Sequence, residues 1–160
     1  GIPVGLSYKG FDFSMLWQGS ALCSVQLSGP AVWDFPLYDQ SRTGKVRKMH
    51  LNRWTPETAA TATYPALHYG IHNNNKQQYS SLFLYDASYI RLKNVEIGYT
   101  LPKAWTSKAG IQSVRIYAQG QNLLTFDRLG DVDMDPEIKN GDGSWFPVQR
   151  VVNLGINMTF

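Results

Sequence analysis

The sequence predicts an all-β fold, made of about five strands of an antiparallel transmembrane β-barrel. Along five segments, apolar residues alternate with small or polar ones, which is the period-two pattern of a strand with one apolar face. The connections between these segments alternate short, long, short and long, as turns and loops do in outer-membrane barrels. Five strands cannot close a barrel, and open strand edges are not tolerated in lipid. We therefore expect the chain to be a fragment, completed by strands outside this sequence.

The composition leaves few other classes of protein. The net charge of +3 is small and scattered, so it gives no support to nucleic-acid binding. Cys23 is the single cysteine, which excludes an internal disulfide and a thiolate metal site. The sequence has no apolar run of about eighteen residues and hence no transmembrane helix, whereas a membrane strand needs only about 9–11 residues.

The first two expected strands, residues 2–9 and 11–18, form a hairpin. In "IPVGLSYK" and again in "FDFSMLWQ" every second residue is apolar, and a short turn at residues 9–10 joins the two segments. A long connection, residues 19–81, follows. It is rich in Pro, Asn, Thr and Gly and carries no strand or helix period, so we expect it to be either functional or disordered.

The third strand, residues 88–101, contains a change of phase. Val95 and Ile97 alternate with polar neighbours, but Ile90 and Leu92 fall on the opposite parity. This predicts a β-bulge near Lys93 and the residue after it, Asn94. A short turn at residues 102–110 leads to a fourth strand at 113–122, and a long loop at 125–147 precedes the last strand at 150–160.

The two faces of these strands predict two environments. On the polar face of the fourth strand the side chains would point into the barrel lumen, and they are Arg115, Tyr117, Gln119 and Gln121. On the apolar face we expect lipid contact, with an interfacial girdle of aromatic residues at one end of the strands. The residues proposed for this anchoring are Tyr8, Phe11, Tyr99, Leu154, Ile156, Met158 and Phe160.

Several segments together resemble one family. They are "LFLYDASYIRLKNVEIGYTLP" (residues 82–102), "RIYAQGQNLLTF" (115–126), "MDPE", "FPVQR" and the terminal "LGINMTF", with "NRWTPE" (52–57) upstream. In order and spacing they look like the C-terminal end of the SusC/RagA-type TonB-linked outer-membrane proteins. The resemblance covers most of residues 50–160.

The resemblance implies a 22-stranded barrel, plugged by an N-terminal domain, to which this chain would supply roughly the last five strands. Such proteins are integral to the outer membrane of Gram-negative bacteria. They import oligosaccharides or peptides together with a SusD-like surface lipoprotein, and the TonB complex would act through the missing N-terminal part. Phe160 at the end of the last strand resembles the signal that the barrel-assembly machinery reads.

The long connections hold the candidate contacts to substrate or partner protein. Flat aromatic rings can contact either a substrate or a partner protein, and Arg53 directly precedes Trp54 in "NRWTPE". The aromatic candidates are Trp33, Trp54, Tyr64, Tyr69 and Trp145. For each of them the alternative is packing of the loops against each other and against the barrel rim.

Metal binding and catalysis have little support. Asp131, Asp133 and Asp135 have the spacing of the first calcium ligands of an EF-hand loop, but Pro136 stands where that loop needs glycine. We expect no cofactor, and if calcium binds, these three aspartates are the ligands to test. No set of Ser, His and Asp carries a catalytic motif such as G-x-S-x-G, so we expect no enzyme.

Two other folds remain open on the sequence alone. One is a soluble or surface-attached β-sandwich whose loops bind a ligand. The other is an eight-stranded small barrel assembled from several chains. A sandwich would bury the apolar face of the last strand under a second sheet, whereas a barrel would leave that face to lipid.

Overall fold

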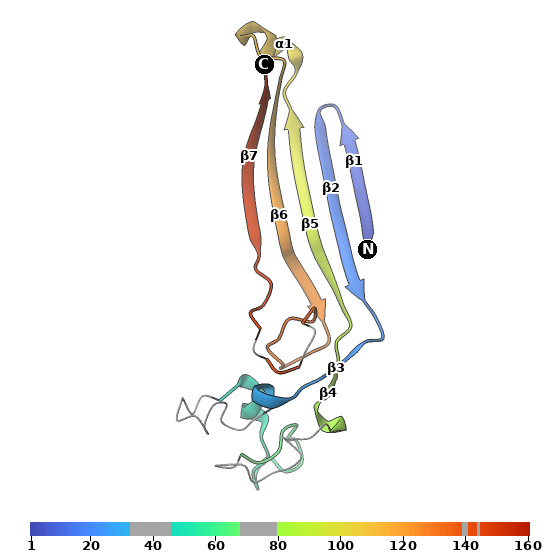
Figure 1. Ribbon diagram of the computed structural model, residues 1–160, viewed down its shortest axis with the longest axis vertical. Helices are drawn as coiled ribbons and strands as arrows, with labels where there is room; N and C mark the ends of the chain where they lie inside the picture. Colours follow the sequence, from blue (N-terminus) through green and yellow to red (C-terminus); the bar gives the residue numbers. More distant parts are fainter. Residues whose placement is uncertain (33–45, 68–79, 139–140, 144) are drawn as a thin grey trace. The chain divides into compact units, whose positions relative to one another are not determined.

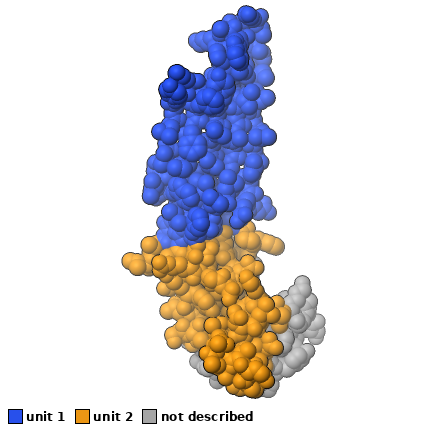
Figure 2. All heavy atoms as spheres, turned by 180° about the vertical axis from the view of Figure 1, so that it is seen from behind, with its two compact units in different colours: residues 1–20, 89–126, 148–160 blue, residues 21–88, 127–147 orange. Residues whose placement is uncertain are grey.

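The alternating segments form one five-stranded antiparallel sheet, with strand order β1-β2-β5-β6-β7 (Figure 1). The computed structural model describes residues 1–32, 46–67, 80–138, 141–143 and 145–160. The sheet belongs to unit 1 (residues 1–20, 89–126 and 148–160), and the remainder, residues 21–88 and 127–147, is unit 2 (Figure 2). The sheet strands are β1 (Ile2–Tyr8), β2 (Phe11–Ser20), β5 (Tyr89–Thr100), β6 (Ser113–Asp127) and β7 (Val151–Thr159).

The remaining elements are short. Between β5 and β6 lie α1 (Lys103–Thr106) and the 3₁₀ helix η6 (Ser107–Ala109). Unit 2 contains β3 (Ser24–Gln26), β4 (Leu84–Asp86) and the 3₁₀ helices η1 (Gly29–Ala31), η3 (Lys48–Asn52) and η5 (Ser81–Phe83). Within the described ranges, no helix has the length and apolarity to cross a membrane.

The hairpin of β1 and β2 turns at Lys9 and Gly10, as the sequence predicts. Both residues have positive φ angles, 47° and 88°, which is the type I′ geometry that matches the twist of two-stranded ribbons. Tyr8 and Phe11 face each other as the closing pair. A Cβ on Gly10 would lie 2.8 Å from the carbonyl oxygen of Thr100, so the turn requires glycine on two counts.

The predicted bulge is confirmed at Lys93. The register of β2 against β5 pairs Leu16 with Asn94 and then Trp17 with Leu92, so Lys93 is the extra residue on β5. The inserted residue reverses the parity of the strand. Leu92 and Ile90 therefore lie on the same apolar face as Val95 and Ile97, although they fall on the opposite parity in the sequence.

The register collects apolar side chains from all five strands on one face of the sheet. Leu6 pairs with Phe13, Phe13 with Ile97, and across the sheet Ile116 pairs with Ile156. Residues of β7 on this face are exposed, Leu154 to 84% and Val152 to 70%. A β-sandwich would have buried them, so the alternative of a β-sandwich does not fit the structure.

The strand bounds follow the predicted ranges closely, except in β6. This strand continues to Asp127, past the predicted end at residue 122. Asn122 adopts a positive φ of 52°, and its side-chain amide donates to the carbonyl oxygen of Gln149 at 3.1 Å. The local change of backbone hides the strand from a period-two search, because apolar residues become consecutive at Leu123 and Leu124.

The long connections, which the sequence places at residues 19–81 and 125–147, are folded where the structure describes them. They form a core of their own in unit 2, whose buried apolar residues are Leu27, Ala31, Val32, Met49, Tyr64, Phe83, Ala87, Leu129 and Val132. Backbone hydrogen bonds join distant segments, from the Leu27 amide to Phe83 and from the Ser28 amide to Gly141. Several of the core residues lie in short 3₁₀ helices and turns, so the sequence shows no helical or strand periodicity that would predict this core.

Candidate functional site: the polar face of the sheet

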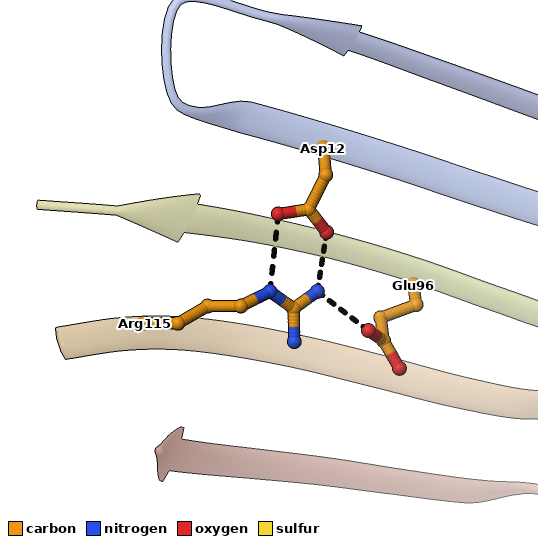
Figure 3. Close-up of polar contacts among 3 residues, drawn as sticks. All are labelled: Asp12, Glu96 and Arg115. Atoms are coloured by element: carbon orange, nitrogen blue, oxygen red, sulfur yellow. Dashed lines mark hydrogen bonds and ion pairs between the residues drawn. The ribbon is translucent and has the colours of Figure 1, made fainter. Parts of the chain in front are cut away.

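Arg115 forms the centre of an ion cluster on the polar face (Figure 3). Its guanidinium projects from β6 and forms a two-point contact with Asp12 of β2, in which Nε donates to Oδ1 at 3.0 Å and Nη2 donates to Oδ2. Nη2 also donates to Oε1 of Glu96 on β5 at 2.6 Å. One side chain thus links three adjacent strands through charge-assisted hydrogen bonds, which are stronger than neutral ones.

Two glycines make room for this cluster. Gly98 pairs with Asp12 across β2 and β5, and a Cβ at this position would collide with the Arg115 guanidinium. On the other side of β6, Gly155 pairs with Tyr117, and a Cβ there would collide with the tyrosine ring. The Arg115 carbon Cζ lies 5.1 Å from the centroid of that ring, which is within the range of a cation–π contact.

The cluster presents carboxylates, a cation and an aromatic face together. Two carboxylates surround one guanidinium, so these three groups carry a net charge of about −1, and their side chains retain 25–38% of their exposure. Gln119 and Gln121 continue the same face of β6, with Gln119 paired to Asn153. This arrangement suits non-covalent contact with a polar partner.

The aromatic residues proposed for anchoring lie at one end of the sheet. Tyr8 pairs with Phe11 and Phe11 with Tyr99, and the rings of the latter pair have centroids 4.4 Å apart. Phe160 follows β7, whose Thr159 accepts a hydrogen bond from the Gln112 amide. Figure 1 places the C-terminus and the β1–β2 turn at the same end of the sheet. The girdle and the outward row (Leu154, Ile156, Met158) therefore share the exposed apolar face.

The structure places the proposed loop contacts in two different environments. Trp54 is 46% exposed and Trp145 is 64% exposed, and Arg53 next to Trp54 is also exposed, so these three remain candidates for contact. Trp33 and Tyr69 lie outside the described residues.

Tyr64 is a core residue, which corrects its assignment as a surface contact. It is only 3% exposed, and its hydroxyl donates to the carbonyl oxygen of Val32 at 2.6 Å. Its ring packs against His50, with centroids 4.6 Å apart, and its own carbonyl accepts from the Trp54 amide at 2.7 Å. An aromatic residue in a loop sequence reads the same whether it is buried or exposed, so only the fold separates Tyr64 from Trp54.

The acidic loop does not assemble a metal site within the described residues. Asp131 accepts from the Asn52 side chain at 2.9 Å and lies 3.9 Å from the Lys48 ammonium, and Asp135 caps the amide of Glu137 at 2.9 Å. No group of three or more His, Cys, Asp or Glu side chains in the described part of the chain is placed to hold a metal. The local contacts of the carboxylates instead stabilise the loop.

Two titratable groups near this loop have shifted pKa values. Burial raises the pKa of Tyr85 in β4, and the negative charge of Asp131 adds to the effect. Hydrogen bonds from Ser88 lower the pKa of Asp86, and the Arg128 guanidinium 3.2 Å away acts in the same direction. Both groups belong to unit 2.

The sequence did not reveal Asp12 and Glu96 as partners of Arg115. Each stands at a polar position of its strand, so the alternation alone places all three residues on one face. Their contact depends on register, which only the strand pairing supplies. Gly98 was a further signal, because a glycine inside a strand marks the close approach of another group.

These features define a class of structure, a segment of the wall of a transmembrane barrel. It has one exposed apolar face and one polar face that carries partly exposed ion pairs. No family model matches the sequence. Individual proteins do match it over its whole length.

The relatives are TonB-dependent receptors. A TonB-dependent receptor of Formosa agariphila is 30% identical over the full chain, and this chain covers 16% of that protein. The TonB-dependent receptor SusC of Bacteroides thetaiotaomicron is 26% identical over the full chain, which covers 15% of SusC. The solved structure of the RagAB peptide transporter superposes with a TM-score of 0.71 at 25% identity, over 99% of this chain and 17% of the transporter chain.

The chain is a fragment of a SusC/RagA-type TonB-dependent outer-membrane protein. It spans about 16% of the length of the curated relatives it matches. Proteins of this family are integral to the outer membrane of Gram-negative bacteria, and the matched relatives are receptors and transporters rather than enzymes. An eight-stranded barrel assembled from several chains is thereby set aside, because the matching proteins are single large chains.

Proposed function

We propose that this chain forms part of the barrel wall of a TonB-dependent transporter. The observation that carries the proposal is the division of the sheet into an exposed apolar face and a polar face built around Arg115. The apolar face contacts lipid, and the polar face, with Tyr117, Gln119 and Gln121, lines the lumen. The chain supplies the C-terminal strands of that barrel, and Phe160 is read by the barrel-assembly machinery.

The transporter imports oligosaccharides or peptides with a SusD-like surface lipoprotein. Support comes from relatives named SusC and RagAB, the latter described as a peptide transporter. In unit 2, exposed Trp54 and Trp145 with Arg53 provide the contact surface for lipoprotein or substrate, because aromatic rings bury large area at low entropic cost. Energy reaches the barrel through TonB and a plug domain, which belong to sequence outside this chain.

The Arg115 cluster has a specific role in this proposal. By joining β2, β5 and β6, it holds the lumen wall in a fixed register next to a plug that must rearrange during transport. Glu96 and Asp12 leave the cluster with excess negative charge, which favours basic side chains of the plug.

The test uses the complete transporter in its own host. A strain that lacks the gene is complemented with the wild-type gene or with a Trp54→Ala, Arg53→Ala variant, and uptake of labelled oligosaccharides and labelled peptides is measured. We expect the wild type to restore uptake of one of the two substrate classes and to co-purify with a lipoprotein from mild detergent. The double variant should lose part of that uptake and part of the co-purifying lipoprotein. Lys48→Gln, also in unit 2, is the matched control. If the wild type restores uptake of neither class, the proposed function is wrong.

A further inference from the structure

The two short connections of the sheet concentrate positive charge. Lys9 occupies the β1–β2 turn, and Lys103 and Lys108 occupy the connection between β5 and β6. All three are exposed, and neither segment, residues 7–11 nor residues 101–112, contains an aspartate or glutamate. Figure 1 shows both connections at the same end of the sheet. This end of the sheet therefore carries three lysines on two connections whose own sequences contain no acidic residue.

The turn directs Lys9 toward the apolar side of the sheet. The Lys9 ammonium lies 5.1 Å from the centroid of the Tyr8 ring, and Tyr8 pairs with Phe11 on the apolar face. The left-handed backbone of Lys9 and Gly10 fixes the tight hairpin that holds this arrangement. The ammonium thus sits where the lipid-contacting face ends.

The second connection combines its lysines with an exposed tryptophan. Trp105, in α1 between Lys103 and Lys108, is 67% exposed. The segment is nevertheless ordered, because the Ile111 amide donates to the Thr106 carbonyl and the Trp105 amide donates to the Pro102 carbonyl. An ordered, exposed indole beside lysines is suited to the membrane interface, where the ring lies at headgroup level and ammonium groups reach the polar layer.

We propose that Lys9, Lys103 and Lys108, together with Trp105, bind the phosphate groups of anionic glycerophospholipids in the leaflet at this end of the sheet. Charge complementarity selects this occupant, since three ammonium groups border an apolar face that contacts lipid chains. The proposal goes beyond transport and requires only that the sheet is embedded in the bilayer. Each lysine near an anionic surface strengthens binding by about fivefold, so three together give about a hundredfold preference.

The test is lipid retention by the complete transporter. The protein is equilibrated in mixed micelles of phosphatidylglycerol and phosphatidylcholine with matched acyl chains, and bound lipids are counted by native mass spectrometry. We expect the wild type to retain phosphatidylglycerol preferentially and the Lys9→Gln, Lys103→Gln, Lys108→Gln variant to lose that preference. Lys48→Gln removes one positive charge from unit 2, as each single variant does from the sheet, and should leave the preference intact. Equal retention by the triple variant and the wild type would overturn the proposal.

A second readout locates the bound lipid and excludes a site for soluble phosphate. In vesicles, brominated phosphatidylglycerol should quench tryptophan emission of the wild type more than that of Trp105→Phe, and brominated phosphatidylcholine should show a smaller difference. Excess glycerol phosphate should not displace the lipid, and displacement would contradict a membrane site. Substrate uptake by the triple variant is measured separately, so a failed lipid result leaves the transport proposal standing. If the triple variant does not assemble, the single variants are measured instead, and each should lower the preference for phosphatidylglycerol about fivefold.

Discussion

Replacing Tyr64 with phenylalanine removes one oxygen atom from the core of unit 2. In the native structure that hydroxyl donates to the carbonyl oxygen of Val32 at 2.6 Å, and both residues are almost fully buried, at 3% and 1% exposure. The substitution keeps the ring and its contact with His50. It leaves the buried Val32 carbonyl without this donor, which costs about 1–3 kcal/mol.

The appropriate assay reports on local opening in the complete protein. A loss of about 1–3 kcal/mol raises the open population of unit 2 roughly 5- to 150-fold. Where opening is fast, proteolysis and hydrogen exchange both follow that population. We expect faster amide exchange in the segment around Trp54, whose amide donates to the Tyr64 carbonyl, and faster cleavage of the loops. Substrate uptake by the assembled protein should remain close to the wild-type level.

Two comparisons show what would refute this reasoning. Tyr85→Phe makes the same chemical change at a half-buried tyrosine packed on the margin of the same core, and its effect should be smaller. If Tyr64→Phe instead reduces uptake and leaves exchange unchanged, Tyr64 contacts substrate and its placement in the core is wrong. Trp54→Ala should show the opposite pattern, with reduced uptake and little change in exchange.

The remaining predictions concern the two faces of β7 and one carboxylate of unit 2. Ile156→Arg places a charge on the apolar face near the middle of β7, which costs about 2–4 kcal/mol in contact with lipid. The folded fraction in outer membranes should fall, whereas Asn153→Arg, on the polar face and paired with Gln119, should fold normally. Gly155→Ala should reduce assembly because the added Cβ collides with the ring of Tyr117. The second substitution Tyr117→Ala removes that ring and should restore assembly. Hydrogen bonds from Ser88 lower the pKa of Asp86 from its ordinary value of 3.8. The ionised carboxylate therefore stabilises the folded state fully above pH 3.8, and this stabilisation is lost as the pH falls through the lower pKa of the folded state. Asp86→Asn should remove this acid sensitivity, measured by hydrogen exchange in unit 2.

The strands and the two faces of each strand could be predicted from the sequence, because apolar and polar residues alternate along them. The alternation of Val95 and Ile97 gave the apolar face of β5, and the bulge at Lys93 was visible as a break in that alternation. The end of β6 could not be read, since the positive φ of Asn122 interrupts the alternation. The sequence placed Arg115 on the polar face but did not predict its ion pairs, because alternation gives the face of a residue and not its cross-strand neighbour.

The core of unit 2 had no sequence signature at all. Its buried residues, such as Leu27, Phe83 and Leu129, come from segments far apart in the chain and are joined by turns and isolated bridges rather than by regular elements. Composition rich in Pro, Asn and Gly describes such a segment equally well when it is ordered and when it is not. The mistaken role of Tyr64 has the same origin.

The most direct test of the account is to ask which face of β7 contacts lipid. Spin labels are attached at Leu154→Cys and, separately, at Asn153→Cys in the complete protein, after native cysteines such as Cys23 have been replaced. Collisions with oxygen, which concentrates in the bilayer, and with a water-soluble nickel chelate are then compared. The account predicts that the label at 154 collides mainly with oxygen and the label at 153 mainly with the chelate. The reverse order, or equal exposure of both labels to the chelate, would contradict the assignment of this sheet to the barrel wall.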